Sequence, residues 1–344
     1  MKIYTNSLYG MVLFLFVSVV SAQESQLVLD KNGDFKITGW SIYSCSDCNY
    51  TKAEEKANYS KLAALSDVLR KNPVLEDIKG FDCNVMLYSE FYGDKKYGYG
   101  IPGKMSVQFC YFFNNKGKVA SATIEPPSFG IHINQLSITS CNSLGFRTPG
   151  KVNDADNPNF NQKKWELAAE KSSPIFFIPG KKETLIPGVD VYADETVIIY
   201  NPERPDYWLP VTIKEIFEAW IDFYKYGPDK YESEITLKML EEEYALFSED
   251  EKNSNAYSGG RGSAPLLNVD SDVNDVQVMR LNPKYWNTNL PKSDIQILSF
   301  NVLQDKNRYT TEAKEQLKYN GGSYHLTRFL EALDIKSLLS AIDR

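Results

Sequence analysis

Apolar side chains recur along this chain with two different periods, and each period predicts a different secondary structure. The five residues 196–200 (Thr-Val-Ile-Ile-Tyr) are β-branched or aromatic throughout, which is typical of a largely buried strand. Pro202 ends this strand, because proline has no N–H group to donate to a neighbouring strand. Between Pro205 and Pro210 the backbone stays extended, which predicts a stiff loop that carries Tyr207 and Trp208.

The same stretch continues into an amphipathic helix. Thr212 and Glu215 have capping-box spacing, in which each side chain accepts a hydrogen bond from a free backbone N–H of the other. Gly227 followed by Pro228 predicts the end of the helix. Its apolar stripe consists of Ile213, Ile216, Phe217, Trp220, Ile221 and Tyr224.

The N-terminal half shows one more capped helix and several strand patterns. A second capping box at Thr51 and Glu54 starts a helix that stops at Asn72-Pro73. Alternation around an Asn-Gly pair predicts a β-hairpin over residues 27–40. Further strands are expected at 84–88, 105–113, 118–124 and 129–138, which together predict a helix packed on an antiparallel sheet.

The C-terminal half is expected to be richer in helix. A helix carries Leu237 and Phe247, and a third capping box at Ser248 and Glu251 starts another turn. Strands are predicted at 277–281 and 295–302. Two short apolar stripes near the end of the chain are out of phase, so Asp334 is expected to mark a break between two helices.

These elements predict an α+β fold of antiparallel sheets with packed amphipathic helices. Residues 148–173 are polar and contain proline and asparagine, which favours a linker between an N-terminal domain at 23–147 and a helix-rich C-terminal domain at 174–344. A long loop within one domain is the alternative.

The first 22 residues have the pattern of an export signal. Lys2 precedes a ten-residue apolar run at 11–20, and Val20-Ser21-Ala22 is a small-residue cleavage site. The run is short for a membrane span, and no later stretch approaches one. We therefore expect a secreted or periplasmic protein without a membrane span.

Charge narrows the possible partners. The 344-residue chain has a formal net charge of −7, which becomes −8 once Lys2 is removed with the signal. A mildly acidic chain without a basic block is a poor match for nucleic acid. The expected partner is instead a peptide, a glycan or another protein.

The five cysteines all lie in the N-terminal half. Export permits disulfides, and Cys83 and Cys110 flank neighbouring predicted strands and could pair. Cys45 and Cys48 precede a capped helix, where a thiolate would be stabilised. We favour a structural disulfide there over thiol redox chemistry, because no βαβ pattern precedes the pair and Asp47 opposes a thiolate.

Local motifs for cofactors and metals fail in their context. Residues 98–104 (Gly-Tyr-Gly-Ile-Pro-Gly-Lys) match part of a phosphate-binding loop, but a strand pattern follows where a helix is needed. The acidic residues near Asp270 begin like a calcium loop without completing it. Both histidines, His132 and His325, stand outside any zinc-protease motif. The sequence therefore indicates no cofactor and no metal.

Aromatic residues supply the candidate binding site. Tyr207 and Trp208 follow an Asn-Pro pair after a strand, and Tyr285 and Trp286 repeat this arrangement loosely after a second strand. Such rings suit sugar or peptide stacking when exposed, and they complete a core when buried. The repeat indicates two similar aromatic loops beside strands, and a shared aromatic surface is the hypothesis that a structure tests.

No catalytic motif accompanies these elements, so the catalytic residues are unknown. The sequence favours an exported protein that acts as a binding or structural component without chemistry of its own, rather than an enzyme. The alternative is a secreted hydrolase, acting on glycans, that uses carboxylates from distant segments.

The export signal makes a direct prediction. Expressed in an exporting cell, the mature chain is expected to begin at Gln23, as N-terminal sequencing or intact mass will establish. Ala22→Leu removes the small residue at the cleavage position and should leave the signal attached. Retention of residues 1–22 in the unmodified chain would contradict the assignment.

Overall fold

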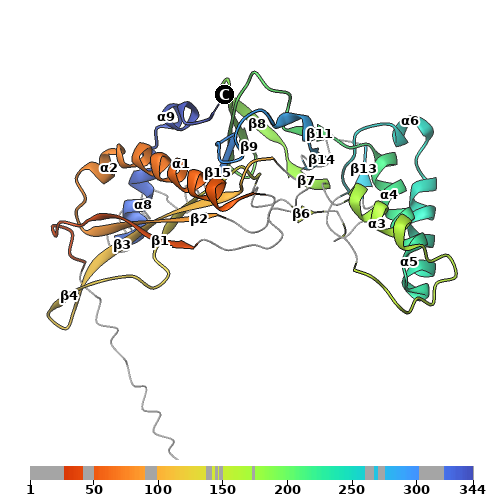
Figure 1. The fold of residues 1–344 in the computed structure, drawn as a ribbon, viewed down its shortest axis with the longest axis horizontal. Helices are drawn as coiled ribbons and strands as arrows, with labels where there is room; N and C mark the ends of the chain where they lie inside the picture. Colours follow the sequence, from red (N-terminus) through yellow and green to blue (C-terminus); the bar gives the residue numbers. More distant parts are fainter. Residues whose placement is uncertain are drawn as a thin grey trace, which may run out of the picture.

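The computed structural model describes residues 27–41, 50–89, 99–136, 142–143, 146, 150–172, 175–259, 267–269, 276–301 and 321–343. These residues form two antiparallel-rich sheets covered by helices, which confirms the α+β fold (Figure 1). In the part of the chain described, no helix combines the length and apolar composition that a membrane crossing requires.

Nine of the described strands form the larger sheet, in the order β1-β2-β3-β5-β15-β10-β9-β8 with β4 paired to β3. All neighbours are antiparallel except β1 and β2. The strands are β1 (Phe35–Ser41), β2 (Phe81–Ser89), β3 (Gly103–Asn115), β4 (Lys118–Ser121), β5 (Ser128–Ile133), β8 (Lys181–Ile186), β9 (Val189–Tyr192), β10 (Thr196–Tyr200) and β15 (Ile297–Asn301).

The smaller sheet has the order β13-β12-β14-β7-β6, with β11 paired to β14. Its strands are β6 (Asn142–Ser143), β7 (Ile175–Pro179), β11 (Trp208–Pro210), β12 (Tyr257–Ser258), β13 (Leu267–Asn268) and β14 (Val276–Leu281).

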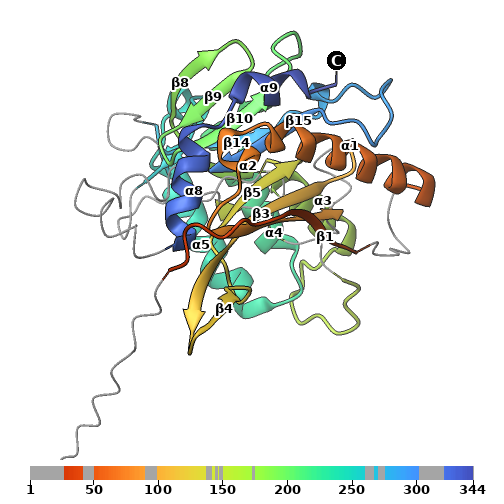
Figure 2. The same cartoon turned by 90° about the vertical axis from the view of Figure 1, so that its left-hand side faces the viewer.

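The helices divide between the two sheets. Those packed on one face of the larger sheet are α1 (Lys52–Arg70), α2 (Pro73–Glu76), α8 (Gly321–Glu331) and α9 (Ile335–Ser340), as Figure 2 shows from the end of the molecule. At the opposite end lie α3 (Gln162–Ser172), α4 (Ile213–Tyr226), α5 (Lys230–Ala245) and α6 (Glu249–Lys252), while a 3-10 turn η1 (Pro283–Tyr285) follows β14. The apolar stripe of α4 packs on the smaller sheet.

Strand β10 is buried on both faces and joins two separate cores. Val197 and Ile199 pack under the helices of the larger sheet. Ile198 points to the other side, into an apolar cluster between the two sheets that we call the inter-sheet core. The inter-sheet core consists of Ile178, Tyr192, Ile198, Tyr207, Trp208, Tyr285 and Ile297. The uninterrupted apolar run at 196–200 reflects this two-sided burial.

The helix boundaries that the sequence predicts from capping residues are confirmed. All three predicted capping boxes form, at Thr51, Thr212 and Ser248. Asp334 caps α9 by accepting a hydrogen bond from the Ser337 N–H, which separates α8 from α9 as the phase shift predicted. Gly103 and Lys104, at the end of the glycine-rich stretch, are the first residues of strand β3.

The predicted hairpin over 27–40 is wrong. Residues 35–41 instead pair with β2 in parallel, and Leu27 forms an isolated bridge to Phe113. The Asn-Gly pair is not a turn: a Cβ on Gly33 would lie 1.6 Å from the Phe81 carbonyl oxygen. The glycine is therefore needed because two backbones approach closely and not because φ is positive.

The division into two domains at 148–173 stays a prediction. Strands from either side of this segment share the larger sheet, where β5 pairs with β15. Helix α3 occupies the C-terminal part of the segment.

His325 of α8 is a buried histidine without a hydrogen-bond partner on either ring nitrogen. Its ring lies 4.2 Å from the ring of Phe81, between α8 and β2. Burial, followed by the charge of Arg328, lowers the pKa of His325 to about 4. The unfolded chain binds this proton near pH 6.5. Burial of a neutral His325 therefore costs no unfolding free energy above pH 6.5, and the free energy of unfolding falls as the pH drops towards 4.

We predict that His325→Phe reduces this sensitivity to acid. At pH 5 the native chain should lose about 2 kcal/mol of unfolding free energy through His325 relative to pH 7.5, and the variant should not. Urea denaturation of both proteins at the two pH values measures the difference. His132→Gln, on the half-buried surface of β5, is the control, and equal acid sensitivity of native and His325→Phe proteins would contradict the assignment.

Candidate binding pocket

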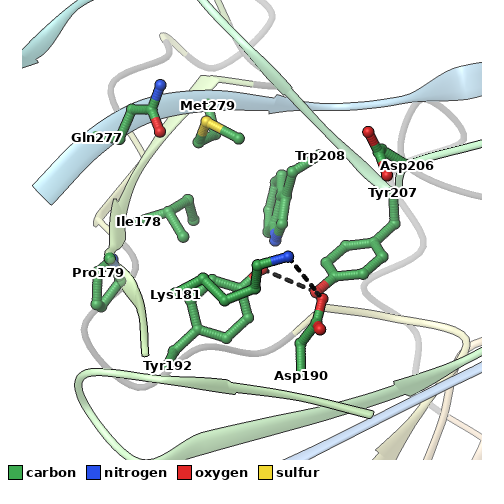
Figure 3. Close-up of a pocket in the computed structure, with 11 residues that line it drawn as sticks. Ile178, Pro179, Lys181, Asp190, Tyr192, Asp206, Tyr207, Trp208, Gln277 and Met279 are labelled. Carbon is green, nitrogen blue, oxygen red and sulfur yellow. Dashed lines mark hydrogen bonds and ion pairs between the residues drawn. The ribbon is translucent and has the colours of Figure 1, made fainter. Parts of the chain in front are cut away.

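A pocket of about 210 Å³ opens at the edge of the inter-sheet core, where the chain passes from the smaller sheet to the larger one (Figure 3). Its apolar walls come from Ile178, Met279 and the rings of Tyr192, Tyr207 and Trp208. The polar groups of the pocket belong to Lys181, Asp190, Asp206 and Gln277, and Pro179 and Gly180 complete the lining.

Two adjacent strands, β8 and β9, position the charged pair of Lys181 and Asp190. β7 ends at Pro179, and the chain enters β8 at Lys181. β8 and β9 are joined through Gly188, whose φ of 91° favours glycine. The resulting register places Lys181 opposite Tyr192, with Asp190 two residues away on the same face of β9.

The Asp190 carboxylate is buried and satisfied by several donors. Thr184 donates its hydroxyl to Oδ1 at 2.6 Å, and Tyr207 donates to Oδ2 at 2.8 Å. The Lys181 Nζ lies 3.6 Å from Oδ2. A buried charge requires such pairing, so the carboxylate anchors the β8–β9 hairpin to the Tyr207 loop.

Two tyrosine hydroxyls continue this network. The hydroxyl oxygens of Tyr192 and Tyr207 are 2.8 Å apart. Since Tyr207 gives its proton to Asp190, Tyr192 is the donor in this second bond. Burial raises the pKa of both tyrosines, and burial with nearby Asp190 raises that of Tyr200 to about 12. All three therefore stay neutral at physiological pH.

The indole of Trp208 carries an unpaired donor. Its side chain is buried, yet Nε1 has no hydrogen-bond partner. In Figure 3 this nitrogen points down into the pocket, on the side of Lys181 and Tyr192. A buried N–H without an acceptor is destabilising by about 1–3 kcal/mol, which a bound molecule with an acceptor would relieve.

The two carboxylates of the pocket do not face each other. In Figure 3 the ring of Tyr207 separates Asp206 from Asp190. Within the described residues, no three His, Cys, Asp or Glu side chains gather closely enough to hold a metal ion.

The two predicted aromatic loops lie side by side in the structure. The ring centroids of Tyr207 and Tyr285 are 6.1 Å apart in an edge-to-face arrangement. Tyr207, Trp208 and Tyr285 are all buried, and Trp286 is half-buried against them. The rings therefore form part of the inter-sheet core rather than an exposed stacking platform. Tyr207 and Trp208 line the pocket, whereas Tyr285 donates to the Gln296 carbonyl at 2.7 Å.

The proposed pairing of Cys83 with Cys110 is wrong, because both thiols are free and buried. Cys83 faces the helix-covered core with its cross-strand partner Phe109. Cys110, the next residue, points to the opposite face, where its sulfur accepts a hydrogen bond from Asn84. Burial raises the pKa of Cys83 to about 12, which makes it unreactive. Cys45 and Cys48 lie outside the described residues, as does the acidic loop that begins at Asp270.

Sequence reasoning missed Lys181 and Asp190. The available signal was Asp190 itself, a lone carboxylate in the apolar stretch Val-Asp-Val-Tyr at 189–192. A charged residue at such a position requires partners. Here they are Lys181 of the neighbouring strand and Tyr207 of a loop distant in the sequence.

Comparisons with protein-family models, curated proteins and solved structures found no match for this chain.

We predict that Tyr207→Phe destabilises the protein by about 1–3 kcal/mol, because Asp190 and Tyr192 each lose a buried hydrogen-bond partner. Tyr231→Phe, at a 73% exposed position on α5, is the matched control and should change stability by less than about 0.5 kcal/mol. Chemical denaturation of both variants measures the difference. Equal effects would show that the network does not stabilise the fold.

Proposed function

We propose that the protein is an exported binding protein, without chemistry of its own, and that the pocket beside Trp208 is its ligand site. The observation that carries this proposal is the buried, unpaired Trp208 N–H, which points towards the pocket. A preformed, mostly apolar pocket with a few converging polar groups is the usual form of a small-molecule site.

The arrangement of carboxylates favours binding over hydrolysis. A glycosidase requires an acid and a base, or a nucleophile, on the two sides of one bond. Asp190 is held by Thr184 and Tyr207, and it does not face Asp206. The pocket thus lacks a facing pair among its described carboxylates, which weakens support for the hydrolase alternative.

The size of the pocket limits the ligand. A volume of about 210 Å³ corresponds to roughly seven groups of the size of a water molecule. This space accommodates one small polar molecule or the terminal unit of a larger one. The apolar export segment at the start of the sequence supports a ligand encountered outside the cytoplasm.

We predict that a mixed library of sugars, amino acids, organic acids and amines contains a ligand that raises the melting temperature of the protein. Trp208→Phe keeps an aromatic ring but removes the N–H, so it should weaken binding about tenfold. The control is Trp165→Phe, because the Trp165 N–H also lacks a partner but lies outside the pocket.

Calorimetric titration of the native protein and both variants gives the three affinities. Equal affinities for the two variants would place the ligand elsewhere. No ligand from any chemical class would contradict the proposed function.

A further inference from the structure

Two uncharged groups of the pocket lining present an unused donor and an unused acceptor. The donor is Trp208 Nε1. The acceptor is the oxygen of Tyr192, whose proton is given to Tyr207 and whose lone pairs stay available. A hydroxyl group both accepts and donates hydrogen bonds, so it matches both partners.

The charges of the pocket disfavour an anionic ligand. Lys181 is paired with Asp190, and Asp206 adds a second carboxylate to the lining. The charged groups of the lining therefore carry no positive excess to attract a carboxylate or a phosphate. An ammonium group, in turn, has no lone pair to accept from Trp208.

Lys181 is suited to contacts at the mouth of the pocket. Its side chain is 52% exposed, and its 3.6 Å separation from Asp190 leaves donors available to a ligand. Gln277, across the pocket in Figure 3, adds an amide with donors and an acceptor. The polar groups are thus spread around the space instead of concentrated at one point.

The walls between these polar groups are apolar. Ile178, Met279 and the indole face of Trp208 supply carbon surface. A molecule with C–H groups on its faces and hydroxyls at its edges complements such a lining.

We propose, on the basis of the binding function above, that the ligand is a neutral polyhydroxyl molecule of the size of one monosaccharide, free or at the end of a glycan. One hydroxyl accepts from Trp208 and donates to Tyr192, while further hydroxyls contact Lys181 and Gln277 at the mouth.

The test is calorimetric titration with glucose, galactose, mannose, N-acetylglucosamine and myo-inositol, alongside acetate, lactate, glycine and ethanolamine. At least one neutral polyol is expected to bind, and more tightly than every charged probe. Trp208→Phe and Tyr192→Phe should each weaken that binding about tenfold or more. Trp165→Phe and Tyr285→Phe remove equivalent groups outside the pocket lining and should leave the affinity unchanged.

Each other outcome is decisive. Tighter binding of an acid or an amine through Trp208 would overturn the ligand class and preserve the binding function. Polyol binding that Tyr192→Phe does not affect would overturn the proposed hydroxyl contact. An absence of binding by every probe would overturn the ligand class and, with the mixed library also negative, the binding function.

Discussion

The structure depends on strands β10 and β15, which are covered on both faces. Their backbone groups are satisfied by pairing with each other and with β9 and β5. One set of their side chains packs under α8 and α9, and the other packs against the smaller sheet through Ile198 and Ile297. Every buried side chain of these two strands must be apolar or hydrogen-bonded. The strands therefore contribute to both cores, and their packing helps to set how the two sheets lie together.

The pocket is a product of the same arrangement. Core residues form its walls, so the Trp208 and Tyr207 rings cannot rearrange without disturbing the packing between the sheets. The polar groups come from the β8–β9 hairpin, which Asp190 ties to the Tyr207 loop. A site built on strands and held by buried hydrogen bonds is preorganised before any ligand arrives.

Features encoded by neighbouring residues were predictable, and features encoded by distant ones were not. The strand at 196–200 and the capping box at Thr212 require only a few adjacent residues, and both form. Gly33 was misassigned, because its backbone approaches Phe81, 48 positions away, and no local pattern records that contact. Tyr207 and Trp208 were identified as candidate binding residues, but their relation to Asp190 and Lys181 depends on sheet topology.

The position of β15 in the larger sheet has a consequence for how the chain folds. This strand lies between β5 and β10 although it is the last of the described strands in the sequence. Until residues 297–301 have been synthesised and docked, β5 and β10 each have an unpaired edge, and the sheet is divided into two pieces. The closing contact between Ser299 and His132 spans 167 residues, nearly half of the chain, so folding is expected to be slow and cooperative. If the chain is exported as proposed, such a delayed closure would keep it in the unfolded form that a narrow translocation channel requires.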